Sequence, residues 1–457
     1  MSNISLSKLK SLMLSDTTKS RALRGSIWVV GGHALSQGLR LLSNLILTRL
    51  LFPEIFGIMA IIQVIIQGLV MVSDLGLVPS IVRSKNTEDS RFLNTAWTIQ
   101  FARNALLWVM TLAISFPIAN FYERPELTYL IPLAAISLLV NGLFPIKVIL
   151  ASRSMNLFRV TAFQILGQFS GSVVSIVLAF YYQNAIIFVA GALFSEILRL
   201  FLNMYFLPGI NNKFEWHRPS VRELFSFGKW IFVASVFGFA AQHANVFILG
   251  KILPADVFGI YTVALVLAML PITVCNMLNG KVLMPLFSEM DRKGSTIEAI
   301  QKARYVVLGG ASAVTLVIMI ISPFFFSVLY DERYSLAGYI SLLILMVSLP
   351  ELMLIVTLNK LMVEGRSKLY AALKMFRAVA LVSIGILLSN KYGIVGLCVA
   401  TLISGIFTYI LAIRARGMAE LIIIRSEAVI FLSFITVSVL SGYFYFDGVS
   451  QVLHIAD

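Results

Sequence analysis

The chain has 457 residues, of which 59% are hydrophobic and only 13% are charged, and its mean hydropathy is +0.90. A water-soluble globule of this length needs more polar surface, so the composition excludes that class and indicates a protein embedded in a bilayer. The formal net charge of +14 is spread along the chain and not gathered into one patch. This spread argues against nucleic acid as a partner.

Apolar stretches long enough to cross about 30 Å of hydrocarbon recur along nearly the whole chain. The breaks between them are short and carry charged residues, Pro or Gly, which leaves little room for a soluble domain. We therefore predict an all-α polytopic membrane protein, built as two pseudo-symmetric six-helix bundles plus one C-terminal helix. The predicted spans are residues 26 to 48, 55 to 78, 94 to 116, 128 to 150, 160 to 181, 185 to 207, 225 to 249, 257 to 284, 304 to 329, 336 to 358, 369 to 390, 393 to 413 and 428 to 446.

A polar break near the middle of the chain predicts its division into lobes. The stretch LPGINNKFEWHRPSVREL, residues 207 to 224, is the most polar and turn-rich in the chain. The predicted segments are a cytoplasmic N-terminal segment (1 to 25), an N-lobe with six spans (26 to 207), a cytoplasmic linker (208 to 224), a C-lobe with six spans (225 to 413), and a cytoplasmic turn, thirteenth span and short extracytoplasmic tail (414 to 457).

The distribution of Lys and Arg predicts the orientation in the membrane. If the N-terminus is cytoplasmic, 28 of the 36 basic residues fall in cytoplasmic segments or toward the cytoplasmic ends of spans, five fall in extracytoplasmic loops, and the remaining three, Arg40, Arg103 and Lys281, are counted within spans. The positive-inside rule favours that orientation. The first 25 residues carry five positive charges but no apolar core that ends in a small-residue cleavage site, so we expect an uncleaved segment and not a signal peptide.

One phrase of 17 residues occurs twice in the chain. LILTRLLFPEIFGIMAI, residues 45 to 61, aligns without a gap on FILGKILPADVFGIYTV, residues 247 to 263, at an offset of 202. Six predicted spans separate the copies, so both lie on the same side of the membrane and form a parallel repeat about an axis along the membrane normal. Locally, Pro53 and Pro254 interrupt the helix and predict a tight extracytoplasmic hairpin, with a direct ligand role as the alternative.

The first span carries a polar face. His33, Gln37, Arg40 and Asn44 are spaced 4, 3 and 4 residues apart, which keeps them within roughly 60° of arc at about 100° per residue. An arginine at the centre of a span costs about 2.5 to 3.5 kcal/mol. Arg40 lies ~20 Å from the cytoplasmic end, too deep to reach the headgroups easily. We predict that this face lines a water-filled cavity and binds substrate, the alternative being hydrogen bonds between helices.

The second half repeats this polar face without its charge. At the repeat offset Arg40 corresponds to Gln242, and Asn245 lies one position from the counterpart of the first-span asparagine. Asp74 in the second span corresponds to Asn276 in the eighth. We predict that Gln242, Asn245 and Asn276 line the same cavity, and interhelical hydrogen bonding remains the alternative for the asparagines.

Five further ionisable residues are candidates for a coupling or a structural role. Arg103 and Glu196 lie ~14 Å and ~16 Å from the same membrane face, so we predict a salt bridge between them inside the first half. Asp74 and Lys281 lie near cytoplasmic ends of spans and can reach the headgroups. Glu351 in the tenth span is a candidate for ion coupling.

Signatures of catalysis and of metal binding are missing from the sequence. There is no G-x-x-x-x-G-K-[ST], H-E-x-x-H or G-x-S-x-G motif, and the four histidines are scattered over different depths. Cys275 and Cys398 both fall within apolar spans, which favours packing roles for them. We expect no catalytic residue, no metal and no cofactor. The small-residue motif GQFSG, residues 167 to 171, predicts close helix packing.

The phrase LTRLLFPEIFGIMAI followed by DLGL, residues 74 to 77, resembles the polysaccharide-exporter branch of the multidrug/oligosaccharidyl-lipid/polysaccharide superfamily, the Wzx-type flippases. The resemblance covers residues 22 to about 415. It implies a V-shaped pair of six-helix lobes around a central cavity, in a bacterial inner membrane, that turns over an undecaprenyl-diphosphate-linked oligosaccharide by alternating access. Arg40 is the best match to a residue that attracts the diphosphate.

The resemblance also implies partners. They are the lipid-linked oligosaccharide, membrane lipids, and the polymerase and glycosyltransferases that assemble O-antigen, capsule or exopolysaccharide. Members commonly have twelve or fourteen spans, so thirteen is a departure. Two other functions stay open at this point: a drug or cation antiporter of the same superfamily, and a membrane-embedded glycosyltransferase or polymerase. The deep charge at Arg40 favours an anionic substrate over a cationic drug.

Overall fold

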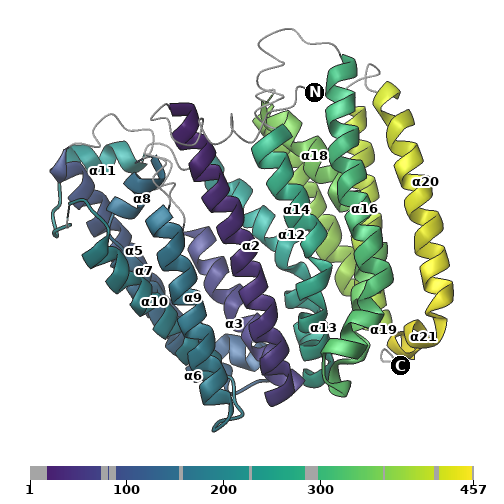
Figure 1. Ribbon diagram of the computed structural model, residues 1–457, viewed down its shortest axis with the longest axis horizontal. Helices are drawn as coiled ribbons and strands as arrows, with labels where there is room; N and C mark the ends of the chain where they lie inside the picture. Colours follow the sequence, from purple (N-terminus) through teal and green to yellow (C-terminus); the bar gives the residue numbers. More distant parts are fainter. Residues whose placement is uncertain are drawn as a thin grey trace, which may run out of the picture. The chain divides into compact units, whose positions relative to one another are not determined.

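The computed structural model describes residues 18–73, 81, 89–153, 158–210, 212–225, 229–283, 297–363, 366–415 and 421–454. All regular structure in these residues is helical (Figure 1). Seven of the described helices are long and apolar enough to cross a membrane, and up to nine if each of two bent helix pairs counts as one span. The predicted all-α polytopic membrane class is confirmed.

The chain forms two compact units, which are described separately. Unit 1 comprises Met1–Leu51 and Ile65–Phe232, and unit 2 comprises Phe52–Val64 and Val233–Asp457. The helix α3 (Pro53–Val72) therefore begins in unit 2 and ends in unit 1.

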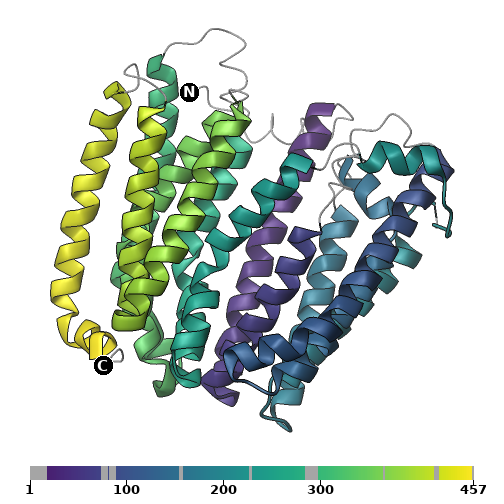
Figure 2. The same cartoon turned by 180° about the vertical axis from the view of Figure 1, so that it is seen from behind.

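Unit 1 is a bundle of helices in two contacting groups. In the first, α9 packs against both α2 and α10; in the second, α5 packs against α6, α7 and α11. Figure 2 shows the same helices from behind. The bounds are α2 (Thr18–Leu50), α5 (Ser90–Tyr122), α6 (Leu127–Ala134), α7 (Ile136–Gly142), α8 (Lys147–Arg153), α9 (Phe158–Ala179), α10 (Ile186–Phe206) and α11 (Arg218–Phe225).

Small residues allow α9 and α10 to approach closely. A Cβ atom on Gly171 would lie 2.7 Å from the Cβ of Ser195, and one on Gly167 would lie 3.0 Å from the Ser195 carbonyl oxygen. On the other side of the contact, a Cβ on Gly191 would overlap the hydroxyl of Ser175. The predicted packing role of the GQFSG motif is confirmed.

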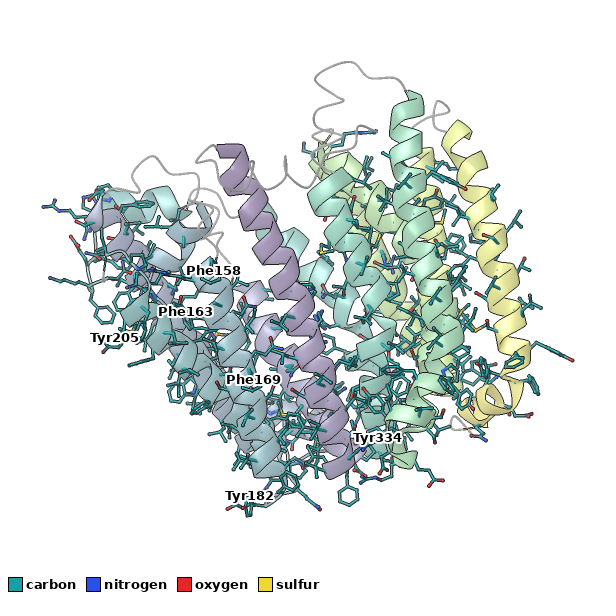
Figure 3. All side chains as sticks on the ribbon, viewed as in Figure 1. Phe158, Phe163, Phe169, Tyr182, Tyr205 and Tyr334 are labelled. Carbon is teal, nitrogen blue, oxygen red and sulfur yellow. The ribbon has the colours of Figure 1, made fainter. Side chains whose placement is uncertain are left out.

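Large aromatic side chains cover the outer side of this helix pair. Figure 3 shows Phe158, Phe169, Tyr182 and Tyr205 along α9, α10 and the turn between them. These four residues are between 47% and 71% exposed. In a bilayer such a surface is solvated by lipid tails, so exposed apolar side chains on these spans are what the membrane environment requires.

Unit 2 is a second helical bundle whose spans include two bent pairs. The axes of α17 and α18 differ by 48°, and those of α20 and α21 by 86°. In the long helix α19 the backbone leaves helical geometry at Gly393 (φ 51°), where the predicted spans 369 to 390 and 393 to 413 meet. The bounds are α12 (Lys229–Ile252), α13 (Ala255–Ala268), α14 (Leu270–Leu278), the π-helical turn η1 (Asn279–Leu283), α16 (Ile297–Leu329), the 3-10 turn η2 (Glu332–Tyr334), α17 (Leu336–Met346), α18 (Leu349–Val363), α19 (Ser367–Arg414), α20 (Leu421–Phe444) and α21 (Phe446–His454).

Candidate functional site

One face of α2 holds the helix against α9. Gly32 packs on the side chain of Thr161, where a Cβ would clash. Four residues later, Ser36 exchanges two hydrogen bonds with Gln168: its hydroxyl donates to the Gln168 side chain, and Gln168 Nε2 donates to the Ser36 carbonyl oxygen at 2.8 Å. These contacts fix the rotation of α2 and so decide which residues it leaves uncovered.

The predicted polar face of α2 lies beside this packed face and is accessible in unit 1. His33 and Arg40 are exposed, and Gln37 and Asn44 are partly exposed. The structure gives the Arg40 guanidinium no hydrogen bond or ion pair with any described residue. A guanidinium carries five N–H donors in a fixed fork, so it can bind a carboxylate or phosphate by two parallel hydrogen bonds.

The predicted polar residues of unit 2 have mixed environments. Gln242 on α12 and Asn276 on α14 are exposed. Asn245 is half-buried, and its Nδ2 donates to the hydroxyl oxygen of Tyr261 at 3.1 Å. Asn245 therefore ties α12 to α13, while Gln242 and Asn276 keep their amides available.

The predicted salt bridge between Arg103 and Glu196 is wrong. Arg103 Nε donates to the Ser73 hydroxyl at 2.9 Å and its Nη2 to the Val70 carbonyl oxygen at 2.7 Å, so it satisfies the C-terminal end of α3. Glu196 instead pairs with Arg199 on its own helix, at 3.1 Å. The two residues are predicted to lie at similar depths, but they are on helix faces that meet different neighbours.

Two of the predicted residues cannot be placed. Asp74, with the rest of the DLGL motif, lies outside the described residues. Lys281 belongs to η1, but its side chain is outside the described part of the structure.

Glu351 lies in the first turn of α18, directly after the break from α17, and pairs with Arg377 of α19. The side chains are 30% and 10% exposed, so the pair is largely withdrawn from solvent. Gly405 makes room for it, because a Cβ there would lie 2.9 Å from the ring of Pro350 and 4.0 Å from Arg377 Nη1. The carboxylate proposed for ion coupling is thus already neutralised by an arginine of the same unit.

Arg304 is a second buried arginine in unit 2, although the positive-inside pattern predicts it to be a cytoplasmic charge. Arg304 of α16 is 2% exposed, and its Nη2 donates to Thr357 of α18 at 3.1 Å. Nearby, Asn279 Nδ2 donates to the Ile355 carbonyl oxygen at 3.2 Å. These bonds join α16 and η1 to α18. The available signal in the sequence is the position of Arg304 at the first residue of a predicted span.

A polar segment at the start of α5 was also missed. Residues 94 to 100, NTAWTIQ, fall inside a predicted span, yet their side chains bond to two loops of unit 1. The regular occurrence of Asn, Thr and Gln in this stretch was the available signal. No group of three or more His, Cys, Asp or Glu side chains suited to a metal ion occurs among the described residues.

Comparison with known proteins identifies the family of the chain. Residues 46–335, more than half of the chain, match the family described as polysaccharide biosynthesis protein. The chain is 22% identical over 326 residues to the lipopolysaccharide biosynthesis protein WzxC of Escherichia coli K12, which covers 69% of this chain and 65% of WzxC. It is 23% identical over 266 residues to the succinoglycan biosynthesis transport protein ExoT of Rhizobium meliloti, which covers 58% of this chain and 53% of ExoT. The chain thus spans about half to two thirds of the length of these relatives.

Solved structures share the fold at low identity. The lipid II flippase MurJ in an inward closed conformation superposes with a TM-score of 0.66 at 14% identity, over 93% of this chain and 99% of MurJ. An inward-facing multidrug resistance MATE family transporter superposes with a TM-score of 0.60 at 14% identity, over 86% of this chain and 96% of the transporter. The family match shows that the chain belongs to the polysaccharide biosynthesis protein family, and the solved structures show that it shares the fold of MurJ and of a MATE transporter.

Proposed function

We propose that this protein flips undecaprenyl-diphosphate-linked oligosaccharide repeat units from the cytoplasmic to the periplasmic leaflet of a bacterial inner membrane. The product serves the assembly of O-antigen, capsule or exopolysaccharide, and the N-terminus is cytoplasmic. Family membership supports this function, as do relatives named for lipopolysaccharide biosynthesis and for succinoglycan transport.

The observation that carries the proposal is the exposed guanidinium of Arg40 on a helix predicted to span the bilayer. A diphosphate with attached sugars cannot enter hydrocarbon without losing its hydration, whereas its polyprenyl tail is at home there. An accessible arginine at mid-depth offers the diphosphate charge-assisted hydrogen bonds in place of water. His33, Gln37 and Asn44 of unit 1, and separately Gln242 and Asn276 of unit 2, are proposed to supply further polar contacts for the sugars.

A drug or cation antiporter is not favoured. A cationic substrate calls for acidic side chains on the accessible faces, but the charged side chain of the α2 polar face is an arginine. In unit 2 the acid nearest the broken span, Glu351, is held by Arg377. The similarity to MATE transporters is one of fold.

The proposed partners follow from the substrate. Glycosyltransferases would deliver the lipid-linked repeat unit on the cytoplasmic side, and a polymerase would receive it on the periplasmic side. The protein itself would need no catalytic residue, metal or cofactor for this step, because no covalent bond is made or broken.

Deletion of the gene tests the proposal. Lipid-linked repeat units should accumulate in the cytoplasmic leaflet, where they are protected from periplasmic glycosidases in intact spheroplasts, and the surface glycan should be lost. Complementation with the wild-type gene should reverse both effects. Unchanged surface glycan together with increased sensitivity to cationic drugs would contradict flipping and support the antiporter.

A further inference from the structure

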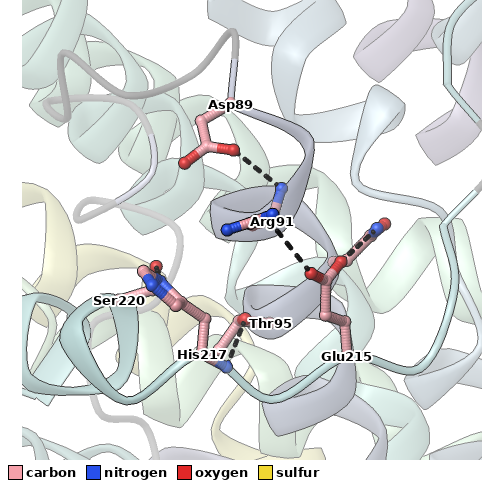
Figure 4. A network of polar contacts seen from close by, with 7 residues as sticks. Asp89, Arg91, Thr95, Glu215, His217 and Ser220 are labelled. Atoms are coloured by element: carbon pink, nitrogen blue, oxygen red, sulfur yellow. Dashed lines mark hydrogen bonds and ion pairs between the residues drawn. The ribbon is translucent and has the colours of Figure 1, made fainter.

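Residues 212–217, here called the strap, follow α10 and lie across the first turns of α5. Three alternate backbone N–H groups of the strap donate to side chains of α5. Lys213 donates to Asn94 Oδ1 at 3.1 Å, Glu215 to Thr98 Oγ1 at 3.0 Å and His217 to Thr95 Oγ1 at 3.1 Å. Part of the predicted linker is therefore a docked element of unit 1 (Figure 4).

Side chains strengthen this docking. Glu215 accepts a hydrogen bond from Asn94 Nδ2 at 2.9 Å, and Arg91 Nε lies 3.9 Å from its other carboxylate oxygen. His217 Nδ1 lies 2.9 Å from the Ser220 hydroxyl oxygen, which joins the strap to α11. Figure 4 shows this chain of contacts from Asp89 to Ser220.

The ring of Phe214 lies on two aromatic side chains of α5. Its centroid is 4.7 Å from that of Trp97 and 5.4 Å from that of Phe101. Phe214 nevertheless remains 64% exposed, and the neighbouring Trp216 is 60% exposed. The hydrogen bonds of the strap backbone thus hold Phe214 and Trp216 in exposed positions.

The depth of the strap in the membrane follows from α5. Exposed apolar side chains on this helix run from Leu106 to Phe121. At about 1.5 Å per residue, a hydrocarbon layer about 30 Å thick that ends near Phe121 begins near Ala102. Phe101 and Trp97 then lie within about 8 Å of the hydrocarbon edge, in the headgroup layer. The strap, which rests on these two residues, lies at the same level.

Exposed basic side chains adjoin the aromatic pair in the sequence and in the first turn of α5. The Arg91 side chain is 69% exposed, and Lys213 and Arg218 are also exposed. Indole rings favour the headgroup layer, where the ring body meets acyl chains and the N–H meets water. Basic side chains at that level meet lipid phosphates, and the cytoplasmic leaflet is the anionic one.

We propose that the strap is an interfacial anchor that binds anionic phospholipid headgroups. Phe214 and Trp216 enter the boundary between headgroups and acyl chains, while Arg91, Lys213 and Arg218 contact the phosphates. The partner is the bulk anionic lipid of the cytoplasmic leaflet. This proposal rests on the geometry of α5 and the strap and on the cytoplasmic N-terminus of the proposed function, and it does not depend on which substrate the protein carries.

The depth of Trp216 can be measured by fluorescence quenching. The full-length protein and its Trp216→Phe variant are reconstituted into bilayers of phosphatidylcholine and phosphatidylglycerol whose acyl chains carry bromine at defined depths. The difference in emission between the two proteins reports Trp216. Strong quenching by bromine near the carbonyl end of the chains, with weaker quenching at the bilayer centre, is expected. A difference signal that no brominated lipid quenches, and that aqueous acrylamide quenches fully, would overturn the anchor.

The preference of the protein for anionic headgroups provides a second test of the anchor. The variant Lys213→Ala/Arg218→Ala should lower the enrichment of phosphatidylglycerol over phosphatidylcholine in the lipid shell at least twofold, as measured by native mass spectrometry of retained lipids. The control Arg49→Ala/Lys391→Ala removes two exposed basic residues predicted to lie on the other side and should lower this enrichment less than the strap variant does. Equal enrichment in both variants, with both proteins monodisperse, would show that the surface serves another partner and would overturn the lipid assignment.

Discussion

Gly57 of α3 and Gly259 of α13, the two glycines of the repeated phrase, face each other at the beginnings of their helices. A Cβ on Gly57 would lie 2.8 Å from the ring of Phe258 and 3.3 Å from the Gly259 nitrogen, and a Cβ on Gly259 would overlap the carbonyl oxygen of Pro53. Both segments belong to unit 2. The first turns of α3 and α13, which carry the two copies of the glycine, thus pack on each other with backbone in contact.

The predicted interruption of the helix at Pro53 and Pro254 is confirmed at both copies. α2 ends at Leu50 and α3 begins at Pro53, and α12 ends at Ile252 and α13 begins at Ala255. Aromatic contacts support the first copy: Phe56 meets Tyr334 edge to face at 5.9 Å between centroids. The phrase thus has a structural role as a turn and as a helix contact.

Replacing Gly259 by alanine should destabilise unit 2. The added methyl group would meet backbone, which cannot rotate away, so we expect a loss of roughly 1 to 3 kcal/mol in the free energy of unfolding. Thermal unfolding in detergent, followed by helical circular dichroism, measures it. Gly309→Ala in α16 is the matched control, because a Cβ there meets nothing within 4 Å. The packing account fails if the two alanine variants unfold at the same temperature.

The pair Glu351 and Arg377 should behave as a buried ion pair that joins α18 to α19. Glu351→Gln leaves the Arg377 guanidinium without its counter-charge and should cost about 3 to 5 kcal/mol. The double variant Glu351→Gln/Arg377→Met removes both charges and should regain most of that stability. A double-mutant cycle of unfolding free energies checks this, and a double variant less stable than Glu351→Gln alone would contradict it.

Arg103 should be coupled to Ser73 and independent of Glu196. The cycle of Arg103→Ala with Ser73→Ala should give a coupling free energy of about 0.5 to 1.5 kcal/mol, since it removes one side-chain hydrogen bond. The cycle of Arg103→Ala with Glu196→Gln should be additive within about 0.5 kcal/mol. Coupling larger than this in the second cycle would restore the salt bridge that the structure excludes.

The sequence was sufficient for the fold class and for the accessible face of α2, because hydropathy locates spans and a period of 3.6 residues assigns faces. It could not place Arg103, since equal depth does not say which neighbour a helix face meets. The polar start of α5 was also not predicted. The apolar residues around Asn94 and Thr98 keep the mean hydropathy of the window high enough to predict a span. The break before Glu351 falls inside the predicted span 336 to 358, and Pro350 in the first turn of α18 was the local signal for it.

We propose that Arg40 holds the anionic head of a lipid-linked sugar during transfer, and a reconstituted flipping assay measures that role. Proteoliposomes with a fluorescent undecaprenyl-diphosphate oligosaccharide report the transfer rate through quenching by an added membrane-impermeant reductant. Loss of one or two charge-assisted hydrogen bonds at about 1.5 to 3 kcal/mol in all predicts that Arg40→Ala flips roughly ten- to a hundredfold more slowly. Arg40→Lys should lose less, and Leu42→Ala, an exposed apolar position on the same helix, should match the wild type. An Arg40→Ala protein that flips at the wild-type rate would contradict the account.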